Sequence, residues 1–252
     1  MPHWYKFALY YLWIAPHALL AVVPVLMYTR KLHKTFPIFF FYTLFETFEF
    51  LLLLPAYLTG HATGALYRNV FIATLVVSTA LKFGIIQEIF NHAFRDYSHL
   101  ERLATASMRW LTGLLVLAAF SAAFYSSGAA RDNFMAGVRL LQRSVTIIQA
   151  GLLLFLFQFS RIFGLSWRSY TFGIALGFAI FASTEIAGWT LGLTSLSEHS
   201  KNLLDLLPTG SYHVSVLVWL GYLLTAEKPV GAATYPVSEM DQWSGELRRN
   251  LP

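Results

Sequence analysis

Ionisable side chains stand inside hydrophobic stretches of this chain, and their chemistry is the most informative feature of the sequence. Glu46 and Glu49 are three residues apart, which places them about 60° apart on one face of a helix. Glu185 lies in a later stretch beside Ser183 and Thr184. A charged side chain at the centre of a hydrocarbon layer costs at least about 2.5–3.5 kcal/mol. Each of these carboxylates therefore needs a structural partner or a function.

The expected depths of the polar groups, taken at about 1.5 Å per residue from the helix ends, separate them into two sets. His17, Glu49 and Glu185 fall roughly 14–15 Å below the outer surface of a bilayer. Glu46 and Lys82 fall together in the inner half, where we predict an intramembrane ion pair between adjacent helices. The outer set, which we predict to bind a ligand, consists of His17, Glu49, Arg143, Glu185 and His213.

Each of these groups also has a structural interpretation. The ion pair of Glu46 and Lys82 would serve packing, because an unpaired charge there would be strongly destabilising. Arg143 is close enough to an interface to extend its guanidinium into water, and His213 lies near a helix end. His17 directly follows a proline, and it fits a neutral histidine bonded to a neighbouring helix as well as a pocket wall.

Patterns of catalytic and metal-binding residues are absent from the sequence. Glu88-Ile-Phe-Asn-His92 has Glu-x-x-x-His spacing, which differs from the Glu-x-x-His of di-iron bundles. The chain has no HExxH, GxSxG or P-loop motif and no cysteine. His17 and His213 differ by about 9 Å in expected depth, which argues against a haem held between two helices. We predict no enzyme and no metal site, and the sequence leaves any cofactor unknown.

Seven hydrophobic stretches, each long enough to cross a bilayer, hold these residues. Hydrophobic residues make up 56 % of the chain and charged residues 12 %, whereas soluble domains carry about 25 % charge. The stretches are continuous, which favours helices over the alternating strands of a barrel. The predicted fold is an all-α bundle of seven transmembrane helices over residues 1–226, followed by a flexible cytoplasmic tail over residues 227–252. The expected spans are about 8–29, 36–58, 66–92, 108–127, 138–163, 170–195 and 210–226.

The basic residues of the loops predict how this bundle is oriented. Most loop Lys and Arg residues fall on the side that holds the 93–107 loop and the tail. Because basic loops stay in the cytoplasm, we expect the N-terminus outside and the C-terminus in the cytoplasm. The net charge of +5 reflects this topology. No basic stripe with interleaved aromatic residues indicates a nucleic-acid partner.

Small residues in the sixth stretch indicate close helix packing. Gly173 and Gly177 form one GxxxG pattern, and Gly188 and Gly192 form a second. Small residues allow helix backbones to approach closely in lipid. We favour packing within the chain over a dimer interface.

Three segments distributed along the chain carry a family resemblance. They read Thr35-Phe-Pro-Ile-Phe-Phe-Phe-Tyr-Thr-Leu-Phe-Glu46, Gln87-Glu-Ile-Phe-Asn-His92 and Gly164-Leu-Ser-Trp-Arg-Ser-Tyr-Thr-Phe-Gly-Ile-Ala-Leu-Gly177. In these segments the chain resembles uncharacterised seven-helix membrane proteins of soil bacteria, notably acidobacteria. The resemblance implies a multi-pass protein of the bacterial inner membrane, and it carries over neither an activity nor a catalytic residue.

Three functions stay open at the level of sequence. The favoured one is a ligand-binding or sensory module with a polar pocket in the outer half of the bundle and output through a separate partner. The second is a small proton-coupled transporter in which Glu49 and Glu185 change protonation, and the third is an accessory subunit of a larger membrane complex. The expected partners are the lipid bilayer and either a lipophilic small molecule or a separate membrane or cytoplasmic protein.

Overall fold

The computed structural model describes residues 3–58, 65–93, 130–159, 166–192 and 198–225, and the statements below concern these residues. The described chain is helical, with no strand in these ranges. The helices are α1 (His3–Leu20), α2 (Val22–Thr29), the short 3-10 helix η1 (Leu32–Lys34), α3 (Pro37–Leu58), α4 (Ala65–Ala93), α6 (Ala130–Phe159), α7 (Tyr170–Gly192) and α8 (Glu198–Leu224).

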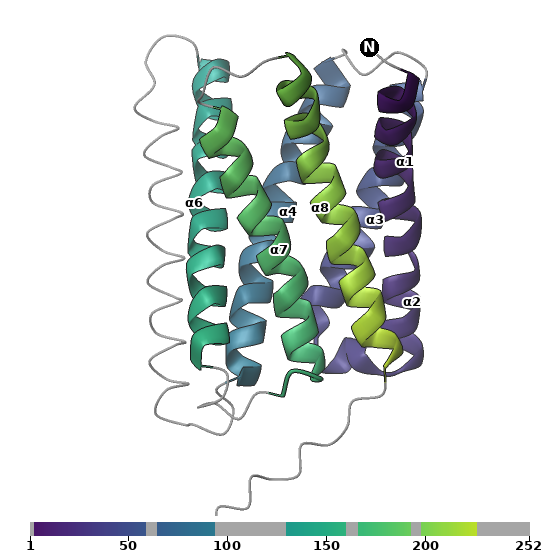
Figure 1. Ribbon diagram of the computed structural model, residues 1–252, viewed down its shortest axis with the longest axis vertical. Coiled ribbons are helices and arrows are strands. Elements are labelled where there is room, and N and C mark those ends of the chain that lie inside the picture. Colours follow the sequence, from purple (N-terminus) through teal and green to yellow (C-terminus); the bar gives the residue numbers. More distant parts are fainter. Residues whose placement is uncertain (1–2, 59–64, 94–129, 160–165, 193–197, 226–252) are drawn as a thin grey trace, which may run out of the picture.

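The long helices lie side by side along one common direction (Figure 1). α1, α4, α6 and α8 begin at the end of the bundle that holds the N-terminus, and α3 and α7 run the opposite way (Figure 1). In this view α7 and α8 lie in front of α4 and α3, and α6 and α1 stand at the two sides. α8 packs against α1, α2 and α7, so the last helix of the described residues closes the bundle against the first.

Four of the described helical segments are long and apolar enough to cross a membrane: Phe7–Thr29, Pro37–Pro55, Val70–Ala93 and Tyr170–Gly188. They correspond to the predicted spans at about 8–29, 36–58, 66–92 and 170–195. Many large apolar side chains on these helices face outward and are exposed, including Phe7, Val25, Phe41 and Phe48. An outer surface of this kind is suited to lipid.

The other predicted spans have different outcomes. The stretches at 138–163 and 210–226 fall on α6, which ends at Phe159, and on α8, which ends at Leu224. Both are helical up to these residues, as predicted. The stretch at 108–127 and the tail at 227–252 lie outside the described residues. The count of seven spans therefore stays a prediction.

The first span consists of two helices because of a proline. α1 ends at Leu20 and α2 begins at Val22. Pro24 has no N–H to donate to the Leu20 carbonyl, and its ring clashes with that carbonyl, so the helical ladder breaks at this turn. Pro16 lies inside α1 and does not end it.

Glu88 fixes the start of α3 from a different helix. One carboxylate oxygen accepts the backbone N–H of Ile38 at 2.9 Å, and the other accepts that of Phe39 at 3.0 Å. The first N–H groups of a helix have no partner within the helix, and its positive dipole end favours an anion. The buried Glu88 carboxylate is therefore a cap that ties α4 to α3.

The first GxxxG pattern packs α7 against α8 within the chain, as favoured from the sequence. A Cβ atom on Gly173 would lie 2.2 Å from Cγ of Tyr222, and one on Gly177 would lie 2.2 Å from Nε1 of Trp219. The hydroxyl of Ser215 donates to the Gly177 carbonyl at 2.8 Å. Only glycine allows the two helices to approach this closely.

Gly177→Leu should destabilise the bundle strongly, because the new side chain would overlap Trp219. We expect the free energy of unfolding to fall by about 3 kcal/mol, the upper end of the usual cost of overpacking. Thermal unfolding in detergent measures this change. Gly151→Leu is the matched control, since a Cβ there meets open space. Equal stability of the two variants would contradict this account of the interface.

Candidate functional site

Polar side chains from six helices meet in the interior of the bundle. They are joined by hydrogen bonds, ring contacts and short-range electrostatic interactions. These residues, hereafter the interior polar cluster, are His17 of α1, Tyr42, Glu46 and Glu49 of α3, Thr74, Ser78 and Lys82 of α4, Thr146 of α6, Glu185 of α7 and Tyr212 of α8.

Glu46 links several members of the cluster. Its carboxylate accepts a hydrogen bond from the Ser78 hydroxyl at 2.5 Å. The same carboxylate interacts electrostatically with His17, Tyr42 and Tyr212. Glu46 thus connects α4 with α1 and α8.

Glu49 and Glu185 each have a threonine hydroxyl as partner. Thr74 of α4 hydrogen-bonds the Glu49 side chain. The Thr146 hydroxyl lies 2.9 Å from an oxygen of Glu185 and 3.1 Å from the Gln142 carbonyl. A hydroxyl can both donate and accept. It can donate to an ionised Glu185, or accept from a protonated one while it donates to Gln142, so both protonation states are accommodated.

Lys82 supplies the positive charge of the cluster. Its Nζ atom lies 4.9 Å from the centre of the Phe181 ring, a cation–π arrangement. It also interacts electrostatically with Glu49. Lys82 and Glu46 therefore lie in the same cluster, and a direct ion pair between them stays a prediction.

His17 has a defined tautomer. Its Nδ1 atom lies 2.7 Å from the Trp13 carbonyl, which can only accept, so Nδ1 carries a hydrogen. The ring stacks on Phe50 with centroids 4.3 Å apart, and its centroid lies 5.4 Å from that of Tyr212. The neutral ring then offers Nε2 as an acceptor.

The side-chain oxygen of Tyr212 distinguishes this residue from the other members of the cluster. Its hydroxyl is buried and has no hydrogen-bond partner among the described residues. It interacts electrostatically with Glu46 and Glu49. A buried polar group without a partner costs about 1–3 kcal/mol, so this hydroxyl marks a position where a further group would be stabilised.

Members of both sets of residues expected from the sequence lie in one cluster. Glu46 and Glu49 were assigned to different depths, although three residues of helix advance by only about 4.5 Å, and side chains easily span that difference. The cluster holds His17, Glu49 and Glu185 of the predicted ligand-binding set. Together with Glu46 it contains three carboxylates and one ammonium group.

A ligand-binding role of Arg143 and His213 stays a prediction. Arg143 is exposed on α6. His213 packs edge-on against Tyr11 with ring centroids 5.6 Å apart, and its buried Nδ1 atom has no hydrogen-bond partner among the described residues. Sequence reasoning missed Tyr42 and Tyr212 because tyrosines in a membrane protein are first interpreted as interfacial anchors. The run Ser211-Tyr212-His213 was an available polar signal.

The four apolar helices and the exposed apolar surface indicate a multi-pass membrane protein. No family model, curated protein or solved structure matches the chain. Among the described residues there is no group of three or more His, Cys, Asp or Glu side chains that could hold a metal ion. The assignment of a function therefore depends on the interior polar cluster itself.

Ser78→Ala should destabilise the protein, because Glu46 would lose its hydroxyl donor in the membrane interior. A hydrogen bond to a charged group contributes about 1.5–3 kcal/mol, and we expect a loss of that size in the free energy of unfolding. Ser211→Ala is the matched control, since the buried Ser211 hydroxyl donates only to the Pro208 carbonyl of its own helix. Denaturation in detergent compares the two. Equal effects would show that the bond between Ser78 and Glu46 does not stabilise the bundle.

Proposed function

We propose that the chain is a seven-helix protein of the bacterial inner membrane that binds a small molecule in the interior polar cluster and passes the signal to a separate partner. The N-terminus would lie outside and the C-terminus in the cytoplasm. The opposite positions of the N-terminus and the end of α8 support an odd number of spans (Figure 1). The resemblance to seven-helix proteins of soil bacteria supports the bacterial inner membrane.

The observation that carries this proposal is the Tyr212 hydroxyl, which is buried near two carboxylates without a partner among the described residues. A ligand that bonds this hydroxyl would meet more carboxylates than cationic groups, since the interior polar cluster holds Glu46, Glu49 and Glu185 together with Lys82. Opposite charges attract strongly where water is excluded.

The surroundings of the cluster define the rest of the ligand. The rings of Phe50 and Phe181 lie against His17, Lys82 and Tyr212. Aromatic faces bind cations as well as apolar groups. The ligand class that fits both the charge and the walls is a lipophilic molecule with a protonated amine or another strong hydrogen-bond donor.

Tyr212→Phe should weaken ligand binding and leave the fold intact, because only one oxygen atom is lost. Glu185→Gln should also weaken ligand binding, because this variant loses a negative charge that attracts the ligand. We expect the affinity to fall about tenfold in each variant, the value of one hydrogen bond to a charged partner. Native mass spectrometry of protein extracted gently from its own membrane measures the bound small molecule.

Glu88→Gln is the control for this experiment, because Glu88 caps α3 and lies outside the cluster. It should lower the stability and keep the ligand. A protein that carries no small molecule, or a Tyr212→Phe variant that carries as much as the natural chain, would contradict the binding site.

Proton-coupled transport is the second candidate, and the Thr146 hydroxyl favours it. That hydroxyl reaches both Glu185 and the Gln142 carbonyl, so Glu185 can gain or lose a proton without leaving a polar group unpaired. A carrier that couples flux to protons needs such a group. The accessory-subunit alternative has less support, because Gly173 and Gly177 are already covered by α8.

Flux measured in proteoliposomes distinguishes a carrier from a sensor. The carrier predicts uptake of the ligand that depends on a pH gradient and is lost in Glu185→Gln. Thr146→Val should also slow the flux, since valine keeps the shape and removes the hydroxyl. Uptake that is unchanged in Glu185→Gln would exclude the carrier.

A further inference from the structure

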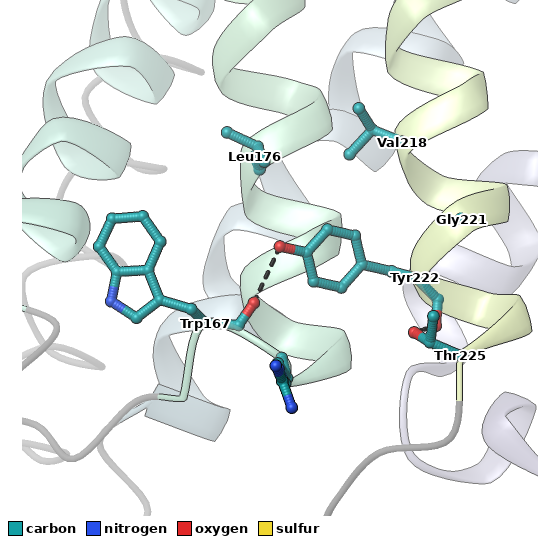
Figure 2. A pocket seen from close by; sticks show the side chains of 7 residues that line it. Trp167, Leu176, Val218, Gly221, Tyr222 and Thr225 are labelled. Carbon is teal, nitrogen blue, oxygen red and sulfur yellow. Dashed lines mark hydrogen bonds between the residues drawn. The ribbon is translucent and has the colours of Figure 1, made fainter.

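A groove with a volume of about 640 Å³ opens between α7 and α8, at the end of the bundle where α7 begins and α8 ends. Figure 2 shows Tyr222 extending from α8 toward α7, where its hydroxyl donates to the Trp167 carbonyl at 2.8 Å. Leu176 and Val218 lie farther along the two helices (Figure 2). The lining consists of Trp167, Arg168, Leu176, Val218, Gly221, Tyr222 and Thr225.

The α8 side of the groove is a single stripe of residues. Val218, Gly221, Tyr222 and Thr225 follow the spacing i, i+3, i+4 and i+7, which places them on one helix face. Gly221 is exposed, and a Cβ atom there would meet open space. The glycine therefore leaves the middle of the stripe free for an occupant.

The groove runs from the membrane interface into the apolar layer. The apolar segment Tyr170–Gly188 begins just after the groove residues Trp167 and Arg168. Trp167 is 61 % exposed, as expected of an aromatic anchor at an interface. Leu176 lies six residues into α7, which corresponds to about 9 Å of helix, so the inner wall of the groove reaches the hydrocarbon.

Arg168 provides a charge at the mouth of the groove. Its side chain is exposed, and no described residue hydrogen-bonds or pairs with its guanidinium. Arg30, in contrast, uses its guanidinium to donate to the carbonyls of Leu224 and Thr225 at the end of α8. Arg168 therefore remains available to an anion that approaches from the interface.

We propose that this groove binds one anionic phospholipid. The phosphate pairs with the Arg168 guanidinium at the mouth, and an acyl chain follows Gly221 toward Leu176 and Val218. An arginine above an apolar wall at a helix end matches the two parts of such a lipid. A soluble phosphate would pair with Arg168 and leave the apolar wall of the groove uncovered. The apolar length of the groove therefore favours the lipid.

Native mass spectrometry of the full-length protein in detergent tests the proposal, with phosphatidylglycerol and phosphatidylcholine as the added lipids. The natural chain should bind phosphatidylglycerol more tightly. Arg168→Gln should weaken this binding about fivefold and abolish the preference, since one cation near a membrane surface contributes about that factor. Gly221→Leu should reduce the binding of both lipids, because the leucine side chain would occupy the groove from a position where its Cβ atom meets open space.

Two variants serve as controls. Lys34→Gln removes an exposed charge outside the groove, and Gly151→Leu adds the same side chain at another open glycine. Both should bind lipid as the natural chain does. Unchanged binding of phosphatidylglycerol in Arg168→Gln and Gly221→Leu would overturn the proposal. Displacement of phosphatidylglycerol from the natural chain by inorganic phosphate would also overturn it. Protection of the Glu227–Lys228 bond from a glutamate-specific protease would assign the groove to the chain's own C-terminal segment if Gly221→Leu removes that protection. This result would also overturn the proposal.

Discussion

The requirement that every polar group in hydrocarbon find a partner determines how this bundle is assembled. Unsatisfied groups cost several kcal/mol in a bilayer, whereas apolar contact between helices gains little over contact with lipid. The hydrogen bonds between helices are therefore the specific connections of the structure. They join Ser78 to Glu46, Thr146 to Glu185, Ser215 to the Gly177 carbonyl, and the Ile38 and Phe39 amides to Glu88. Each of them ties one helix to a different one.

The α7–α8 interface contributes residues near both the interior polar cluster and the groove. Trp219 fits over Gly177 on the inner side, where its ring lies 6.3 Å from that of Tyr42. Tyr222 fits over Gly173 one turn later and forms part of the groove. The cluster residue Tyr212 and the groove residue Val218 are six residues apart on α8, which is about 9 Å of helix. Gly173 and Gly177 set the spacing of α7 and α8 next to them. A change in the spacing of α7 and α8 would alter both sites together.

Much of this architecture follows from the sequence, because apolar length alone identifies a membrane helix. The carboxylates were also identifiable, since Glu46, Glu49 and Glu185 interrupt long apolar runs. What the sequence does not contain is the direction in which a side chain points around its helix. The expected depth of Arg143 resembled that of the carboxylates, for example, and could not show that its side chain is exposed on α6. Tyr212 was missed because its importance depends on what surrounds its hydroxyl and not on its residue type.

The central claim of this account is that the interior polar cluster holds a ligand at the Tyr212 hydroxyl. A density map of the protein in lipid nanodiscs, at a resolution that shows small bound molecules, tests it most directly. The account predicts density that belongs to no protein atom, within hydrogen-bond distance of the Tyr212 oxygen and close to Glu46 and Glu49. A Tyr212 hydroxyl bonded to another protein side chain, with no further density in the cluster, would contradict it.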